Sequence, residues 1–197
     1  MARTRSAALD DPAQIELLAS PARIEIVDTL EALGEAASVA ELAAALGRPA
    51  DGLYYHLRRL CAAGLVREIE APDGNRYRMN ADERVRLRYR PGATANADAV
   101  RRVAASILRV AGRDFDRAIA DRRSVADGDR RELWAARGKG WVSAKDLAEI
   151  NHLLARLDGL LRQPRSRQRD RLIALAWVLA PVEERAPRKR MPAARRE

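Results

Sequence analysis

Hydrophobic periodicity divides the chain into an N-terminal helical unit, a hairpin and a longer helical C-terminal part. Between Ser38 and Ala63, apolar residues recur every three or four positions, which is typical of amphipathic helices. Residues 65–70 and 75–80 are short strand-like runs, and in the second run Arg76 and Arg78 alternate with Tyr77 and Met79. The Pro72-Asp73-Gly74 cluster between these runs predicts a hairpin turn. This order predicts a winged helix-turn-helix unit.

Local signals place the two helices of that unit. Ser38 and Glu41 have the spacing of a capping box, in which each side chain accepts from the other's backbone N–H. Gly47 is suited to the left-handed conformation that follows a helix end. Pro49 suits the opening of the next helix, because proline has no N–H to leave unpaired there. We therefore predict a second helix over residues 50–63.

The second helix has two different faces. Leu53, Leu57 and Leu60 form an apolar stripe, whereas Tyr55, Arg58 and Arg59 lie on the opposite side. The second helix of a helix-turn-helix unit enters the major groove of DNA. The polar face is therefore the candidate reading face.

Two helices precede the motif. Asp11-Pro12 predicts a short helix through Leu18, and Ser20-Pro21 predicts a longer one that Gly34 ends. The longer helix has apolar residues along one side, which complete a three-helix core with the motif: Ile24, Val27, Leu30 and Leu33.

The segment from about Ile15 to Asn80 resembles the ArsR-type winged helix-turn-helix transcriptional regulators of bacteria. The resemblance is carried by LLASPARIEIVDTL (17–30), SVAELAAALG (38–47), DGLYYHLRRLCAAGLV (51–66) and DGNRYR (73–78). It implies a homodimeric repressor or activator with residues 48–59 near the groove and Asn75 and Arg76 at the wing tip. The DNA-binding residues that we predict are Arg48, Ala50, Asp51, Gly52, Tyr54, Tyr55, Arg58, Arg59, Asn75, Arg76 and Arg78.

The sequence differs from the metal sensors of that family. Those proteins carry paired cysteines on the first helix of the motif, or His and acidic ligands on a later helix. Here residues 38–46 contain no cysteine, Cys61 is the single cysteine, and the chain has 2 His. Glu149 and His152 match one E-x-x-H step, but a di-iron site needs a second step and further Glu. We predict no metal and no cofactor, because soft metals need several thiolate or imidazole ligands.

The C-terminal part is predicted to be mainly helical. Residues 84–90 alternate Arg with apolar residues, which indicates a strand whose arginine face contacts either phosphate or solvent. Long amphipathic helices are predicted over 96–122 and 143–161, with shorter ones around Leu133-Trp134 and over 170–179. Such helices beside a winged helix predict a dimer interface. Its predicted residues are Val103, Ile107, Val110, Leu147, Ile150, Leu154, Leu157 and Leu161.

Three tryptophans in this part admit two interpretations. Trp134, Trp141 and Trp177 could line a ligand pocket, but core or interface packing is the preferred interpretation, because tryptophan is a general packing anchor. Whether the protein binds a small-molecule effector therefore stays an open question, and the sequence does not identify one.

Charge and composition bear on partner and compartment. The net charge is +9, with 37 Lys and Arg against 28 Asp and Glu, which favours a polyanionic partner such as double-stranded DNA. Because only three of these cations are lysine, genome-wide composition is an alternative explanation. A single cysteine fits a reducing cytoplasm, and the first residues lack the apolar core of a signal peptide. The longest apolar run, 172–182, is shorter than the roughly 20 residues that cross a bilayer.

The predicted fold class is mainly α. We expect a flexible arm over 1–10, a winged helix-turn-helix domain over 11–83, a strand with a helical dimerisation or effector region over 84–182, and a basic disordered tail over 183–197. No catalytic signature is found, neither a nucleophile elbow nor a P-loop, so we predict a non-enzyme.

Two functions remain open on the sequence. The first is a cytoplasmic, nucleoid-associated regulator that reads an inverted repeat as a homodimer. The second is an interaction module that binds protein or structured RNA. Tyr55, Arg58 and Arg59 favour the first, whereas Asp51 and Gly52 at the helix entry keep the second open.

Overall fold

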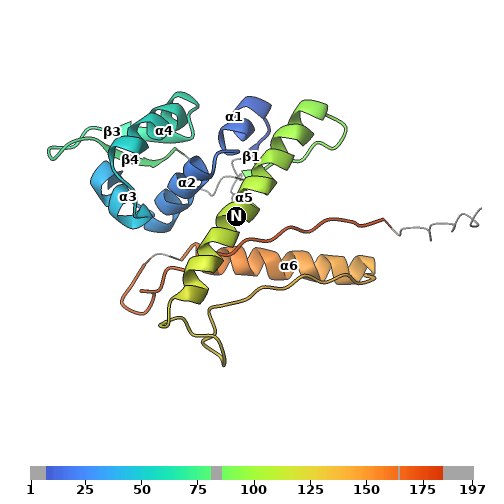
Figure 1. Cartoon of the computed structure of the whole chain (residues 1–197). Coiled ribbons are helices and arrows are strands. Elements are labelled where there is room, and N and C mark those ends of the chain that lie inside the picture. The colour runs from blue at the N-terminus through green and yellow to red at the C-terminus, as the bar shows by residue number, and fades with distance from the viewer. Residues whose placement is uncertain (1–7, 81–85, 164, 184–197) are drawn as a thin grey trace, which may run out of the picture.

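The computed structural model describes residues 8–80, 86–163 and 165–183, and its elements follow the predicted order. They are β1 (Ala8–Leu9), α1 (Pro12–Leu17), α2 (Pro21–Leu33), β2 (Ala37–Ser38), α3 (Val39–Leu46), α4 (Asp51–Ala62), β3 (Val66–Ile69), β4 (Arg76–Met79), β5 (Arg86–Leu87), α5 (Thr94–Ala120) and α6 (Ala144–Leu161). Figure 1 shows α1 to α4 and the hairpin gathered beside the first half of α5, with α6 near its far end. The predicted fold class, a helix-turn-helix unit followed by a helical region, is confirmed.

The predicted local signals form as hydrogen bonds. The backbone N–H of Glu41 donates to Ser38 Oγ at 3.2 Å, and the Ser38 N–H donates to Glu41 Oε2 at 2.7 Å. Gly47 ends α3 at φ +60°, in the left-handed region that favours glycine. Ser143 and Asp146 repeat the capping box at the start of α6. These contacts satisfy backbone donors that a helix start would otherwise leave unpaired.

One apolar core holds the N-terminal unit together. The leucine stripe of α4 is buried, with Leu53 2% exposed and Leu57 and Leu60 fully covered. Each such side chain contributes roughly 1.5–3 kcal/mol by its removal from water. The stripe packs with side chains of α1, α2, α3 and the hairpin: Ile15, Ile26, Leu30, Leu42 and Val66.

The hairpin is the edge of a three-stranded antiparallel sheet in which β4 lies between β2 and β3. Ala37 of β2 faces Tyr77, and Arg67 of β3 faces Arg78. Tyr77 and Met79 are buried, so the alternation along β4 has its predicted apolar face. The sheet therefore ties the wing to the start of α3.

Helix α5 completes this core. Ala99 and Val103 lie in the same buried cluster as the leucines of α4, at 1% and 2% exposure. Ser106 is also buried, and its Oγ donates to Ala19 O at 2.5 Å. Val103 and Val110, which we expected at a dimer interface, are thus buried within the chain, and Ile107 is packed against the same core. Amphipathicity predicted the stripe but not which surface would cover it.

The two segments that flank the predicted winged helix-turn-helix domain pair with each other. Residues 1–7 of the predicted arm lie outside the described residues, but Ala8–Leu9 form a parallel pair with β5. The side chain of buried Asn96 accepts from the Arg90 N–H at 2.8 Å and donates to Arg88 O at 3.1 Å. The described end of the arm, Ala8–Leu9, thus forms a short strand.

The predicted short helices of the C-terminal part are absent from the described residues. Leu133-Trp134 and 170–179 are irregular. Leu133 is half-buried, but the other large apolar side chains of these segments are open to solvent, for example Leu172 at 76%. A helix of about ten residues is marginal in water unless its apolar face packs on a partner. Trp134 and Trp141 are 68% and 90% exposed, so neither contributes to a core within the chain. Residues 184–197 of the predicted tail lie outside the described residues.

Candidate nucleic-acid interface

Helix α4 presents a broad polar face to solvent. Because Leu53, Leu57 and Leu60 turn the other side inward, Tyr54 and Tyr55 remain 47% and 52% exposed. Two large aromatic rings side by side on a surface helix are unusual unless they contact a partner. The first turn adds half-buried Ala50, an N-cap without a side-chain bond, and exposed Asp51 and Gly52.

Tyr55 and Arg59 form a preassembled pair on this face. Arg59 Nη1 donates to the Tyr55 hydroxyl at 3.0 Å, and its guanidinium carbon lies 5.9 Å from the ring centroid. The hydrogen bond and the positive charge of Arg59 lower the pKa of the Tyr55 hydroxyl below its usual range. Arg58 is exposed and has no hydrogen bond or ion pair among the described residues. Its guanidinium is available for phosphate.

The guanidinium of Arg48, just before α4, is already paired with a carboxylate of the same chain. Its guanidinium forms an ion pair with Glu25 of α2, and Arg113 of α5 reaches the same carboxylate at 3.1 Å. Glu25 therefore serves two arginines and links α2 to the turn before the reading helix. Arg48 positions this turn, and its charge is partly neutralised.

Arg76 is the first residue of β4 and pairs with Ile69 beside the turn of the wing. Its Nη2 donates to Glu41 Oε2 at 2.9 Å and to Ala36 O at 3.1 Å, and its Nη1 donates to Asp73 Oδ2 at 3.1 Å. Two carboxylates and a carbonyl thus occupy the guanidinium. The guanidinium of Arg76 is folded back against Glu41, which is 35 residues away in the sequence, and a contact of Arg76 with DNA stays a prediction.

The remaining wing residues are also held by neighbours. Asn75 Nδ2 donates to Glu68 Oε1 at 2.6 Å, and the Tyr77 hydroxyl donates to the same oxygen at 2.7 Å. Burial, together with the hydrogen bond to Glu68, raises the pKa of Tyr77. Arg78 is half-buried and lines a pocket with Glu31 and Asp114. The basic face of β4 is therefore turned toward acidic groups.

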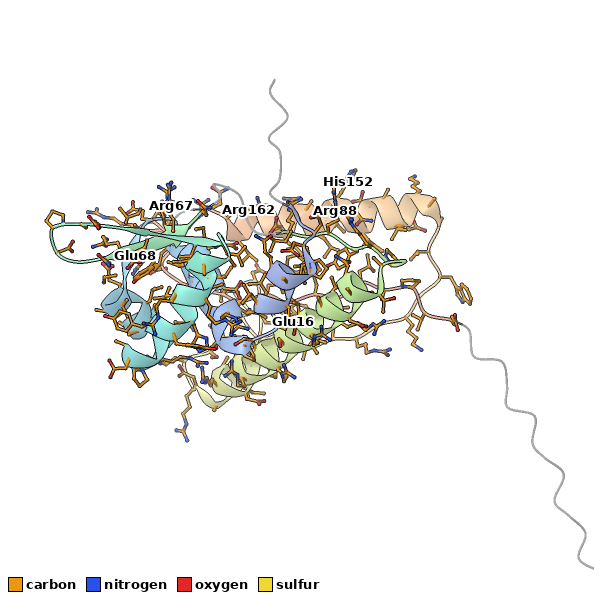
Figure 2. The ribbon with its side chains drawn as sticks, turned by 90° about the horizontal axis from the view of Figure 1, so that it is seen from above. Glu16, Arg67, Glu68, Arg88, His152 and Arg162 are labelled. Carbon is orange, nitrogen blue, oxygen red and sulfur yellow. The ribbon has the colours of Figure 1, made fainter. Side chains whose placement is uncertain are left out.

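Arg67 is the wing residue that sequence reasoning missed. It is exposed on β3, directly opposite Arg78, and it has no ion pair among the described residues (labelled in Figure 2). Like charges directly opposite each other in a ladder are destabilising, so this placement is costly without an anionic partner. The signal was present in the hairpin register, which pairs the two arginines.

His56 lies between the two faces of α4. Burial, then the charges of Arg23, Arg48 and Arg59, lower its pKa below the usual range. Its Nδ1 is buried without a hydrogen-bond partner in the described structure. The imidazole is therefore neutral at physiological pH and adds no charge to the interface.

These features define a helix-turn-helix domain with a short wing. The profile of a family described as a helix-turn-helix domain matches residues 18–69, which run from the end of α1 through β3. This domain supports a DNA-binding transcription regulator, and such domains are typically not enzymes. A comparison with curated proteins finds no match.

Two structural findings concern other kinds of site. Within the described ranges, no helix combines the length and apolarity needed to cross a membrane. Over the same residues, no group of three or more His, Cys, Asp or Glu side chains could hold a metal ion.

Proposed function

We propose that the protein is an ArsR-type, non-metal-sensing transcriptional regulator of the bacterial cytoplasm. It binds an inverted-repeat operator in duplex DNA as a homodimer. The observation that carries this proposal is the exposed face of α4, where aromatic and basic side chains lie opposite a fully buried leucine stripe. A helix of this kind fits the major groove.

The side chains of α4 divide the contacts between them. Arg58 and Arg59 bind phosphates, which supply affinity that depends steeply on salt. Tyr54 and Tyr55 reach base edges or sugars. The wing contributes through Arg67, whose exposed guanidinium binds the flanking backbone, while Arg76 keeps the wing in place.

Helix α6 is the proposed dimer interface. Leu147, Ile150, Leu154, Leu157 and Leu161 follow a spacing of three and four residues, which is the repeat of a coiled-coil seam. No residue of α6 is buried within the chain, and Leu147 and Leu157 are 42% and 40% exposed. Since α5 packs against its own chain, the apolar stripe of α6 is the one that we assign to contact with a second copy. An isologous pair would bury it.

Binding assays with genomic fragments test the proposal. We expect specific retardation of a subset of duplex fragments, and sequencing of the selected DNA should return an inverted repeat with half-site centres about one helical turn or more apart. Failure to bind any duplex at low salt would exclude the proposal.

The alternative is an interaction module that binds protein or structured RNA. Asp51 at the entry of α4 and Glu68, Glu70 and Asp73 around the wing favour it, because acidic groups repel phosphate. Equal retention of folded RNA and duplex DNA, with no enriched sequence, would support this alternative over a regulator.

A further inference from the structure

We propose that Arg23 of α2 and Arg59 of α4 together bind one phosphate of the DNA backbone, in a pocket beside the groove-reading face. The inference rests on the proposed function and deepens it. The pocket is open, has a volume of about 420 Å³, and is lined by α1, the start of α2 and Arg59. Figure 1 shows α1 on the side of α4 that faces away from the wing.

The acidic groups near this pocket are already neutralised. Glu16, labelled in Figure 2 on α1, lies at the pocket and accepts from Arg102 Nε at 2.7 and 2.9 Å. Glu25 carries both Arg48 and Arg113. Among the described residues, this leaves Arg23 and Arg59 without a carboxylate. Two guanidinium groups thus border one pocket, whose lining carboxylate, Glu16, acts on Arg23 through its charge but is hydrogen-bonded to Arg102.

Both guanidinium groups are oriented and retain free donors. Arg23 Nε donates to Leu17 O at the end of α1, which holds the side chain at the pocket. Its two terminal nitrogens have no acceptor among the described residues. Arg59 uses Nη1 for the Tyr55 hydroxyl and keeps its other donors. Planar guanidinium forks of this kind match the oxygens of a phosphate.

Arg23 experiences the positive charge of Arg59 as well as the opposing charge of Glu16. Burial and the neighbouring charge of Arg59 lower the pKa of Arg23. The same arginines also lower the pKa of His56, although burial is the larger cause there. A phosphate in the pocket would relieve this repulsion. Arg59 also donates a hydrogen bond to Tyr55. A phosphate bound to Arg59 would therefore fix the position of the reading helix at one border of the groove.

The test measures binding of the full chain to a labelled duplex of mixed sequence at several salt concentrations. Arg23→Met removes the charge, Arg23→Lys keeps it, and Arg123→Met removes one charge from the segment after α5 as a matched control. We expect Arg23→Met to lose about tenfold in affinity. Arg23→Lys should lose less, and Arg123→Met should behave as the wild type.

A double variant tests whether the phosphate is shared. Because each neutralised phosphate contributes about 0.9 to the salt slope, Arg23→Met/Arg59→Met should lower the slope by about one unit and not by two. Arg59→Met alone should weaken binding comparably to Arg23→Met, so the proposal stays testable if Arg23→Met folds poorly. Wild-type affinity and slope in Arg23→Met, or a loss of two units in the double variant, would overturn the shared site.

A second measurement separates this inference from the proposed function. If the wild type binds no duplex, the regulator is excluded, and the pocket is then tested with inorganic tripolyphosphate. A rise in the melting temperature of the wild type but not of Arg23→Met would support a phosphate site that serves another anion. An equal response of both proteins would overturn the site.

Discussion

Arg76 of β4 and Glu41 of α3 are joined at 2.9 Å, although they lie 35 residues apart. Glu41 also forms the capping box at the start of α3 with Ser38. The hydrogen bonds from Ser38 are the main cause that lowers the pKa of the Glu41 carboxyl below its usual range, and Arg76 adds a smaller effect in the same direction. One carboxylate therefore connects the wing to the first helix of the motif.

Replacing Arg76 should lower the stability of the fold and leave the number of DNA phosphate contacts unchanged. Arg76→Ala leaves Glu41, Asp73 and Ala36 O without their donor, so we expect the melting temperature to fall by about 3–6 °C. The salt slope of DNA binding should stay within error of the wild type. Arg67→Ala is the matched variant on the same hairpin, and it should keep its melting temperature but lose about one unit of slope. The opposite outcomes would restore Arg76 as a contact residue.

The capping box of α3 should make stability sensitive to acid. Because the folded pKa of Glu41 is below its ordinary value of 4.5, its contribution is complete above that pH and is lost as the pH falls through the folded pKa. Ser38→Ala should lower the melting temperature by about 2–4 °C at neutral pH. The difference from wild type should shrink in acid. Ser143→Ala removes the same motif from α6, which has no buried residue, and should change the melting temperature less.

The reading face should be separable from the fold. Tyr55→Ala/Arg58→Ala changes two exposed side chains, so we expect an unchanged melting temperature and at least about fivefold weaker DNA binding at matched salt. Tyr89→Ala/Arg123→Ala removes one exposed tyrosine and one exposed arginine elsewhere and should bind normally. Equal affinity of the first double variant and the wild type would refute the assignment of this face.

The dimer should depend on α6. Leu157→Glu places a charge in the apolar stripe, where burial against a second copy would be strongly unfavourable. Light scattering at micromolar concentration should then report a monomer, against a dimer for the wild type. Leu33→Glu, at 39% exposure against 40% for Leu157, controls for the loss of an exposed leucine. A wild-type protein that is monomeric under these conditions would contradict the interface.

Local chemistry made much of the fold predictable from the sequence. The Ser38–Glu41 box, Gly47 and the Pro72-Asp73-Gly74 turn act over a few residues, and each forms where it was predicted. Such local signals do not predict which element of the fold covers a given apolar surface. Periodicity predicted the apolar stripe of α5 but not that Val103 packs on α1 and α2.

In the candidate site, too, the features set by local spacing were predictable and those set by distant contacts were not. The faces of α4 follow from helical spacing alone, so Tyr55 and Arg58 were predictable. The neutralisation of Arg48 and Arg76 depends on carboxylates distant in the sequence, which only the folded chain brings into contact. Arg23 was missed for the same reason, because its pocket requires α1, α2 and α4 together.

The burial of Ala99 and Val103 against α1 and α2 limits how the protein can be cut or recombined. A fragment that ends after β4 would keep the whole matched domain but would leave the apolar sides of α1 and α2 in water. A chimaera that moves this DNA-binding specificity onto another oligomerisation module must therefore carry α5 with it. The acceptable junction lies beyond Ala120, where the chain leaves that helix.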